Sequence, residues 1–337
     1  MDNSYFDVVA IGNAIMDVLA YVDDAFLVAH TLRKGTMRLV ETEQAKNLCS
    51  QIQCYQPTVE IPGGSAANTA VGFAALGGRA AFMGKVADDN LGKAFTRDIN
   101  AYSVYYATPP LRGDLSTAYC LVLITPDAQR TMNTYLGACQ ALQQDDIDLK
   151  LIRKARITYL EGYQWDIPLA EELMRKVAQV ALASGGKVAF SLSDVLCVER
   201  HRIAFHHLIR QYVDILFANE KEIMSLYQAS TFDEALYFAR RDCSLVALTR
   251  GAKGSVIATP EKVYAIASEP VANVVDTTGA GDIFASGFLY GLSDDKPMAL
   301  CARLGNLCAA EIIKYSGVRP TRHLRNRIKA YSSEVFS

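Results

Sequence analysis

The sequence lacks the features that mark membrane, secreted or nucleic-acid-binding proteins. No apolar run approaches the length that crosses a bilayer, and the first residues are acidic where a secretion signal would be basic. Lysines and arginines are scattered through a chain of net charge −2, without a basic stripe that would indicate nucleic acid as a partner. We therefore expect a cytoplasmic protein that binds neither membranes nor nucleic acid.

Several familiar site patterns are also missing. The eight cysteines include no Cys-x-x-Cys pair, and in a long chain without a secretion signal they are expected to be reduced core residues rather than disulfides or zinc ligands. There is no Walker A loop, and no Gly-x-Gly-x-x-Gly follows the first predicted strand. These absences argue against a zinc protein, a P-loop enzyme and a dehydrogenase.

What the 337 residues do contain is a regular alternation of strand-like and helix-like segments. We predict strands at 7–12, 79–86, 157–160, 187–191, 213–217 and 244–249, and helices at 65–76, 169–184, 200–212 and 297–315. This order is typical of a doubly wound α/β fold, in which a mostly parallel sheet is covered by helices on both faces to give three layers.

Two segments depart from that rhythm. Residues 14–40 and 115–135 alternate apolar and polar side chains, which predicts strands outside the main sheet. We interpret them as a small β-sheet lid inserted in a large nucleotide- and substrate-binding domain of residues 1–13, 41–114 and 136–337. Without repeats or long linkers, the lid would be an insertion rather than an independent domain.

Residues 276–282 read Asp-Thr-Thr-Gly-Ala-Gly-Asp, between an apparent strand at 271–275 and a helix-like run at 283–292. A strand that re-enters as a helix through small residues directs free backbone N–H groups and the positive helix end to one point, which suits a phosphate. A carboxylate at Asp282 would repel a phosphate bound there, so its presence indicates a chemical role. The obvious role is to remove a proton from an attacking hydroxyl. The segment indicates a phosphotransferase; the alternative is a Gly-rich turn whose Asp caps the helix.

Two further segments suggest contacts to a sugar. The pair Gly63-Gly64 opens a predicted helix that carries Asn68 one turn later, so a ligand could approach the backbone and meet an amide that donates and accepts. Asp17 follows the first strand at the carboxyl edge of the sheet and could accept from both hydroxyls of a cis-diol. The structural alternatives are a helix cap with a buried Asn and an exposed loop Asp.

The next segments could serve a nucleotide. Asn219 and Glu222 lie three residues apart after a core strand, where they could hold Mg²⁺ through waters or simply form a capping box. The turn with Thr249, Gly251 and Gly254 closes another strand and could lie along nucleotide phosphates.

In this order and spacing the segments resemble the signatures of the ribokinase-like (PfkB) carbohydrate kinase family, over nearly the whole chain. The pattern at 276–288 resembles the family's C-terminal signature, and Gly63-Gly64-x-x-x-Asn68 its N-terminal one. Within the family the chain is most similar to adenosine kinases, on Gly12-Asn13-x-x-x-Asp17, on Arg130-Thr131 and on the segment 214–220.

This resemblance implies transfer of the γ-phosphate of ATP, assisted by Mg²⁺, to the 5′-hydroxyl of a ribosyl substrate such as adenosine. It implies Asp282 as base, Asp17 on the ribose hydroxyls, and Arg130 as a lid cation that offsets γ-phosphate charge. The other residues that it implies are an anion hole of Gly279, Ala280 and Gly281; substrate contacts at Asn13, Gly63, Gly64 and Asn68; Asn219 and Glu222 on the magnesium side; Asn306 and Ala309 at the ATP purine; and a nucleotide contact at Thr278, which with Asp276 would form a monovalent-cation (K⁺) site.

The departure from adenosine kinases lies in the segment 160–166, where Tyr163 or Trp165 could stack on a purine but Gln164 is polar where an apolar residue is expected. The identity of the acceptor therefore stays open between adenosine, another nucleoside, and a free sugar such as ribose or fructose. A non-catalytic sensor on the kinase fold is a further alternative. The lid leaves two assemblies open, a monomer and a lid-mediated homodimer.

Overall fold

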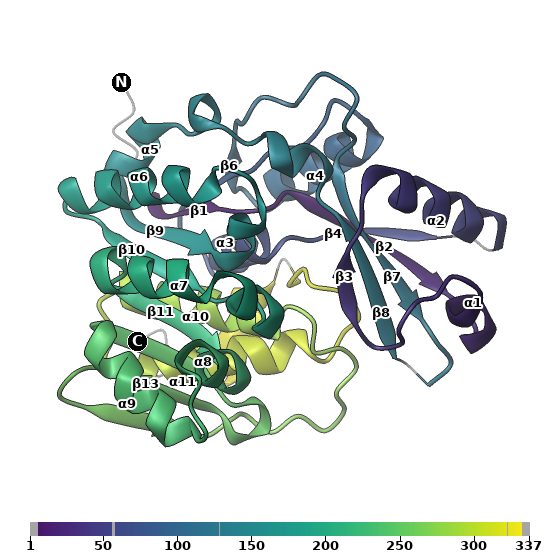
Figure 1. The fold of residues 1–337 in the computed structure, drawn as a ribbon. Coiled ribbons are helices and arrows are strands. Elements are labelled where there is room, and N and C mark those ends of the chain that lie inside the picture. The colour runs from purple at the N-terminus through teal and green to yellow at the C-terminus, as the bar shows by residue number, and fades with distance from the viewer. Residues whose placement is uncertain (1–5, 56–57, 128, 322, 332–337) are drawn as a thin grey trace.

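The computed structural model describes residues 6–55, 58–127, 129–321 and 323–331. They form two sheets, a large one covered by helices and a small one at the side of the molecule that carries α1 and α2 (Figure 1). The two sheets meet where the first strand of the large sheet continues directly into a strand of the small one. This junction positions the site.

The large sheet has the strand order β14-β13-β12-β11-β10-β9-β1-β5-β6. Its strands from β12 to β6 pair in parallel, whereas β13 and β14 form an antiparallel edge. The strands are β1 (Phe6–Ile11), β5 (Ala80–Met83), β6 (Tyr105–Tyr106), β9 (Ala155–Glu161), β10 (Lys187–Ser191), β11 (Ile215–Asn219), β12 (Leu245–Thr249), β13 (Ser255–Ala258) and β14 (Val263–Ile266). The mostly parallel sheet predicted from the sequence is confirmed.

Helices cover both faces of this sheet, as β1 illustrates. Val8 and Ala10 pack in one hydrophobic cluster, with side chains from α3, α4, α10 and α11, whereas Val9 and Ile11 pack in the opposite cluster, with α5 to α9. The helices are α3 (Ser65–Ala75), α4 (Asn90–Ala101), α5 (Leu149–Arg153), α6 (Ala170–Ala183), α7 (Val195–Tyr212), α8 (Glu220–Tyr227), α9 (Phe232–Asp242), α10 (Ala280–Ser293), α11 (Met298–Ile312) and α12 (Leu324–Tyr331). The expected three-layer α/β architecture is therefore confirmed.

The strand predicted at 271–275 is wrong. Val274 and Val275 are each 52% exposed, and this stretch has no strand partner. The backbone N–H of Val275 instead donates to the carbonyl of Ile313 at the end of α11. β-Branched residues favour a pleated surface only where a neighbouring strand supplies a partner, and here the sheet already ends at β14.

The small sheet has the order β3-β8-β7-β2-β4. Its strands are β2 (Ile15–Tyr21), β3 (Met37–Leu39), β4 (Val59–Pro62), β7 (Ala118–Ile124) and β8 (Arg130–Tyr135). The predicted lid segments supply all of them except β4, which comes from a range that we had assigned to the large domain. The helices α1 (Asp24–Ala29) and α2 (Thr42–Tyr55) cover one face, where Met16 and Val18 pack with Leu27 and Ile52 (Figure 1). The other face, with Asp17, is turned toward the large sheet.

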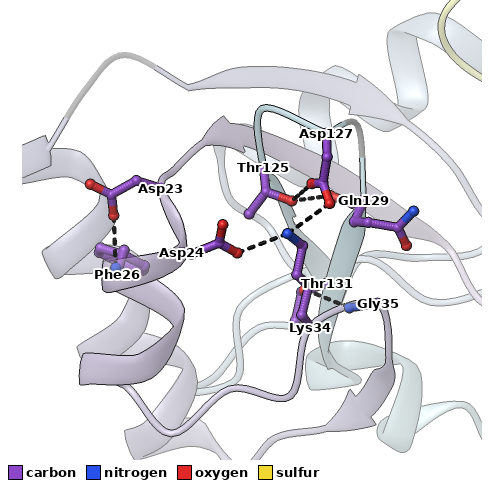
Figure 2. A network of polar contacts seen from close by, with 9 residues as sticks. All are labelled: Asp23, Asp24, Phe26, Lys34, Gly35, Thr125, Asp127, Gln129 and Thr131. Atoms are coloured by element: carbon purple, nitrogen blue, oxygen red, sulfur yellow. Dashed lines mark hydrogen bonds and ion pairs between the residues drawn. The ribbon is translucent and has the colours of Figure 1, made fainter.

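A polar network fixes the tip of this small sheet (Figure 2). The Lys34 ammonium lies 2.8 Å from a carboxylate oxygen of Asp24 on α1 and 2.8 Å from one of Asp127 in the β7–β8 turn. Thr125 donates to the same Asp127 carboxylate at 2.6 Å. The hydrogen bond from Lys34 lowers the pKa of Asp127 to about 2. The turn is thus tied down next to Arg130, the first residue of β8.

Within the part of the chain that the structure describes, no helix is both long and apolar enough to span a bilayer. The cysteine side chains described are free thiols: Cys49 is partly exposed, and Cys120, Cys139, Cys197, Cys243, Cys301 and Cys308 are buried. The side chain of Cys54 lies outside the described residues.

Candidate active site

A cavity of about 610 Å³ lies between the inner face of the small sheet and the carboxyl ends of the large-sheet strands. It brings together predicted site residues from distant parts of the chain. Its lining includes Asn13, Asp17, Gly64, Asn68, Arg130, Tyr163, Asn219, Glu222, Asp276, Thr278, Gly279, Gly281 and Asp282. Thr249 lines a smaller adjoining cavity of about 140 Å³, together with Ser65, Asn219 and Asp282. Gly63, Ala280, Gly251, Gly254, Asn306 and Ala309 line neither cavity.

Asp282 lies in the first turn of α10, where two side chains of α3 hold its carboxylate. Ser65 donates to one oxygen at 2.6 Å, and the Asn68 amide nitrogen donates to the other at 2.8 Å. Burial raises the pKa of Asp282 to about 6, against the opposing effect of these two hydrogen bonds. The carboxylate is therefore oriented, ionised at neutral pH, and more basic than an ordinary Asp, which suits proton removal.

Small residues let α3 and α10 approach closely enough for these contacts. The Ser286 hydroxyl of α10 donates to the carbonyl of Thr69 on α3 at 2.9 Å. A Cβ on Gly72 would collide with the Ser286 side chain. The glycine thus fixes the distance between the helix that carries Asp282 and the helix that orients it.

The start of α10 has the geometry of an anion site. Gly279 is the N-cap with φ of +75°, a conformation that glycine adopts without strain. The backbone N–H groups of the first turn have no partner within the helix, and they open at the positive end of the helix dipole. Gly279 and Gly281 line the cavity, whereas the backbone N–H of Ala280 donates to the carbonyl of Thr277 at 3.2 Å. The anion hole of Gly279, Ala280 and Gly281 stays a prediction.

Asp17 lies on β2, across the cavity from α10. Burial raises its pKa to about 6, while the charges of Arg319 and Arg130 act in the opposite direction. Gly63 leaves room for the carboxylate, because a Cβ there would stand 3.1 Å from the nearer Asp17 oxygen. The structure thus places Asp17 in a desolvated wall of the cavity, so the exposed-loop alternative is wrong.

Arg130 crosses from the small sheet to the segment before α10. Its guanidinium donates to Asp276 at 2.8 Å and to the Thr278 hydroxyl at 3.0 Å. Asp276 also accepts from the backbone N–H groups of Thr278, at 3.0 Å, and Gly317, at 3.2 Å. Both carboxylate oxygens are therefore engaged, and the arginine closes the cavity on this side.

Asn219 and Glu222 form the capping box of α8. The Asn219 side chain accepts from the backbone N–H of Glu222 at 3.0 Å, and the Glu222 carboxylate accepts from the backbone N–H of Asn219 at 2.8 Å. The structural alternative is thus present, but it does not account for the burial of Glu222. Burial raises the pKa of Glu222 to about 8, and no cationic side chain among the described residues lies against it.

Tyr163 and Trp165, the two residues expected to be able to stack on a purine, lie in the segment after β9. Trp165 packs in the core against Phe190 and Phe205, with ring centroids 5.3 and 5.4 Å away, and is absent from the cavity lining. Gln164 is buried and donates to the Asn13 side chain at 2.8 Å, so its polarity does not reach the cavity. Only Tyr163 of the three lines the cavity, and the proposed stacking role of Trp165 is wrong.

Residues that the sequence did not single out hold this site together. The buried Glu161 accepts from the backbone N–H groups of Asn13 and Ala66, both at 2.6 Å, and thereby ties the β1–β2 junction to the start of α3. Ser65 and Arg319 contact Asp282 and Asn68. Ser65 follows the Gly63-Gly64 pair and could have been found from that motif. Glu161 and Arg319 carry no local signal.

The remaining predicted nucleotide residues have structural contacts. Asn306 donates to the carbonyl of Ala267 at 2.9 Å and pins the chain beyond β14, and Ala309 packs partly buried against the core. Gly251 and Gly254 flank a tight turn after β12, both with positive φ.

Known proteins are similar to this chain over most of its length. Residues 6–323 match the pfkB family of carbohydrate kinases. Adenosine kinase 1 of Arabidopsis thaliana is 26% identical, with 94% of this chain and 97% of that protein covered. The ATP-dependent ribose-1-phosphate kinase of Halopiger xanaduensis is 29% identical, with coverage of 81% and 87%.

Among solved structures, adenosine kinase from Sinorhizobium meliloti is 43% identical with a TM-score of 0.92, covering 98% of this chain and 100% of that one. A probable sugar kinase from Rhizobium etli is 42% identical with a TM-score of 0.91, covering 97% and 98%.

Proposed function

The chain belongs to the pfkB family of carbohydrate kinases, and from that premise we propose that it moves the γ-phosphate of ATP to the 5′-hydroxyl of adenosine. Kinases of this family use ATP, usually with Mg²⁺. The observation that carries the proposal is that Asp282 and Asp17 face one cavity from opposite walls. One carboxylate can serve the reacting hydroxyl while the other holds the ribose.

The choice of a nucleoside over a free sugar rests on the rest of that cavity. Its small-sheet wall carries several large apolar side chains around Asp17: Ile15, Leu19, Met37, Leu39, Val122 and Met132. A free ribose has only hydroxyls to place against such a wall, whereas a purine has apolar faces that gain from burial. Tyr163 and Leu196 extend this lining on the large-domain side.

The protein's own groups divide the work of the reaction. Asp17 accepts hydrogen bonds from the ribose 2′ and 3′ hydroxyls, which places the 5′-hydroxyl at Asp282. The Asp282 carboxylate takes the hydroxyl proton as the hydroxyl oxygen attacks the γ-phosphorus, and the bond from that phosphorus to the bridging oxygen breaks so that ADP leaves. The N–H groups at the start of α10, together with Arg130, offset the charge on the transferred group. Contact between Arg130 and the segment before α10 keeps water away from the phosphate.

The residues present fit Mg²⁺ but not K⁺. Glu222 is buried, its pKa is raised to about 8, and no described cationic side chain lies against it, so without a cation it is mostly protonated at neutral pH. A hydrated Mg²⁺ near Glu222 and Asn219 would favour the ionised carboxylate and balance its charge. Mg²⁺ there would neutralise charge on the ATP phosphates. At Asp276, by contrast, Arg130 and two backbone N–H groups already occupy both oxygens. We therefore assign no step to K⁺.

A substrate panel tests the proposal. Adenosine, inosine, ribose and fructose are compared at equal concentration with ATP and Mg²⁺, and ADP formation is followed in a coupled assay. We expect adenosine to give the highest kcat/KM and ribose and fructose to be poor acceptors. A free sugar that outperforms adenosine would refute the nucleoside assignment. If the protein consumes ATP with none of these acceptors and still binds adenosine tightly, the result would favour a sensor.

A further inference from the structure

Arg319 is a buried charge to which the mechanism above gives no task. Its side chain is only 8% exposed, and it lies in the stretch between α11 and α12. Burying a guanidinium is costly unless hydrogen bonds and a counter-charge compensate. The groups that compensate the buried charge of Arg319 therefore indicate its role.

The guanidinium donates to three groups around the site. It reaches the Asn68 side-chain oxygen at 2.6 Å, the Gly63 carbonyl at 3.2 Å and the Asp98 carboxylate at 2.9 Å. Asp98, on α4, supplies the counter-charge. Gly63 and Asn68 belong to the segment that faces Asp17 and Asp282.

These contacts fix which way the Asn68 amide points. A guanidinium only donates, so the Asn68 oxygen must face Arg319 and its nitrogen must face the Asp282 carboxylate, at 2.8 Å. The flipped amide would set donor against donor at Arg319 and acceptor against acceptor at Asp282. Of the two orientations, Arg319 therefore permits only the one that orients the carboxylate.

Arg319 is itself held from both sides. The backbone N–H of Gly317, two residues earlier, donates to Asp276 at 3.2 Å, and the carbonyl of the next residue, Pro320, accepts from the Tyr102 hydroxyl at 2.8 Å. Its guanidinium also stands 6.0 Å from the centre of the Phe95 ring. The donor is thus preorganised before any substrate enters.

We propose that Arg319 is a positioning residue for phosphoryl transfer, which holds Asn68 so that the Asp282 carboxylate faces the substrate hydroxyl. The inference rests on Asp282 as the base. Arg319 also acts on Asp282 through its charge, which lowers the pKa of that carboxyl against the effect of burial. Among the described residues, Asp17, Tyr159, Glu161 and Glu222 also interact electrostatically with Asp282, and none of them contributes positive charge.

The test compares Arg319→Met and Arg319→Lys, with adenosine as substrate, by kcat, KM and the pH profile of kcat/KM. We expect Arg319→Met to lower kcat about 100-fold, the cost of a misplaced reacting group. Its acidic limb should move up by ~1 pH unit, because a positive charge that lowers the pKa of both Asp282 and Asp17 is lost. KM should change less than kcat. Arg319→Lys keeps the charge but places its donors on a single nitrogen, so it should recover part of kcat and leave the acidic limb in place.

Arg240→Lys is the matched control. Arg240 on α9 also donates to backbone carbonyls, those of Thr259 at 2.9 Å and Pro260 at 2.7 Å, but lines neither cavity described above. Its substitution should change thermal stability at most. Folding of each variant is checked by circular dichroism and thermal unfolding.

A folded Arg319→Met with wild-type kcat and an unmoved acidic limb would overturn the inference. If that variant does not fold, Arg319→Lys decides, and its unchanged kcat would overturn the inference equally. Turnover of Asp282→Asn, alone and combined with Arg319→Met, distinguishes a wrong role for Arg319 from a wrong assignment of Asp282 as the base. If Asp282→Asn turns over nearly as fast as wild type, Asp282 is not the base. If Asp282→Asn loses most of its turnover but the Arg319 variants keep wild-type kcat, only the positioning role of Arg319 is refuted. If both hold, Arg319→Met should cost little further turnover in Asp282→Asn, since the two residues act as a unit.

Discussion

Replacing Asp282 by Asn should make the protein more stable and nearly inactive. Asn keeps the size of the side chain, and both hydrogen bonds can be retained. Its oxygen can accept from the Asn68 amide, and its nitrogen can donate to the Ser65 hydroxyl, which is able to accept as well as donate. The substitution therefore removes the charge without removing the contacts.

The magnitude follows from the raised pKa. Because folding raises the pKa of Asp282 from 3.8 to about 6, the folded state disfavours the carboxylate. This cost is absent below pH 3.8, grows as the pH rises and is complete above about pH 6. The full shift corresponds to ~3 kcal/mol. Since part of the residue faces the open cavity, we expect a stabilisation of ~1–2 kcal/mol for Asp282→Asn near pH 7.5.

Urea unfolding of wild type and Asp282→Asn at pH 7.5 and pH 5 measures this difference. The gain in the free energy of unfolding should fall to roughly half at pH 5, where the folded wild-type carboxyl is mostly protonated. At the same time kcat should drop by about two to four orders of magnitude, as expected on loss of a positioned base. A variant that is less stable than wild type at pH 7.5 would refute the reasoning about a desolvated carboxylate, as would a gain that does not depend on pH.

Three further results are expected. Asp17→Ala should raise KM for adenosine about 10–100-fold with a smaller effect on kcat, because a charged hydrogen bond contributes ~1.5–3 kcal/mol; an unchanged KM in steady-state assays would remove its ribose role. Gly72→Ala should lower the free energy of unfolding by ~1–3 kcal/mol and also reduce kcat, since the added methyl forces α3 and α10 apart; denaturant titration that shows wild-type stability would contradict this packing. Exchange of K⁺ for tetramethylammonium should leave turnover unchanged, because Arg130 and backbone donors already satisfy Asp276; a several-fold loss of turnover would show that a monovalent cation is needed.

The sequence predicted the large sheet well, because its strands are short apolar runs between amphipathic helices. β10 and β12, for example, lie where the pattern placed them, with the second starting one residue later. The glycine segments Gly63-Gly64 and Gly279 also marked where α3 and α10 begin, since Gly64 and Gly279 are N-caps with positive φ, which glycine adopts without strain.

What the sequence could not show are contacts between residues far apart in the chain. Glu161 reaches Asn13 across 148 residues, and Arg319 reaches Asn68 across 251. A buried Glu or Arg is not distinguishable from an exposed one by its neighbours alone. The same limit explains β4, whose place in the small sheet depends on pairing with β2 rather than on its own residues.

The most direct test of the central claim is the ³¹P NMR spectrum of the wild-type protein incubated with ATP, Mg²⁺ and adenosine. We predict that the γ-phosphate resonance of ATP declines as the resonances of ADP and adenosine 5′-monophosphate grow in equal amounts, and that 5′-deoxyadenosine gives no phosphoester. Phosphate attached at another hydroxyl, transfer to 5′-deoxyadenosine, or no transfer to adenosine at all would contradict the assignment of Asp282 as the base for a nucleoside 5′-hydroxyl.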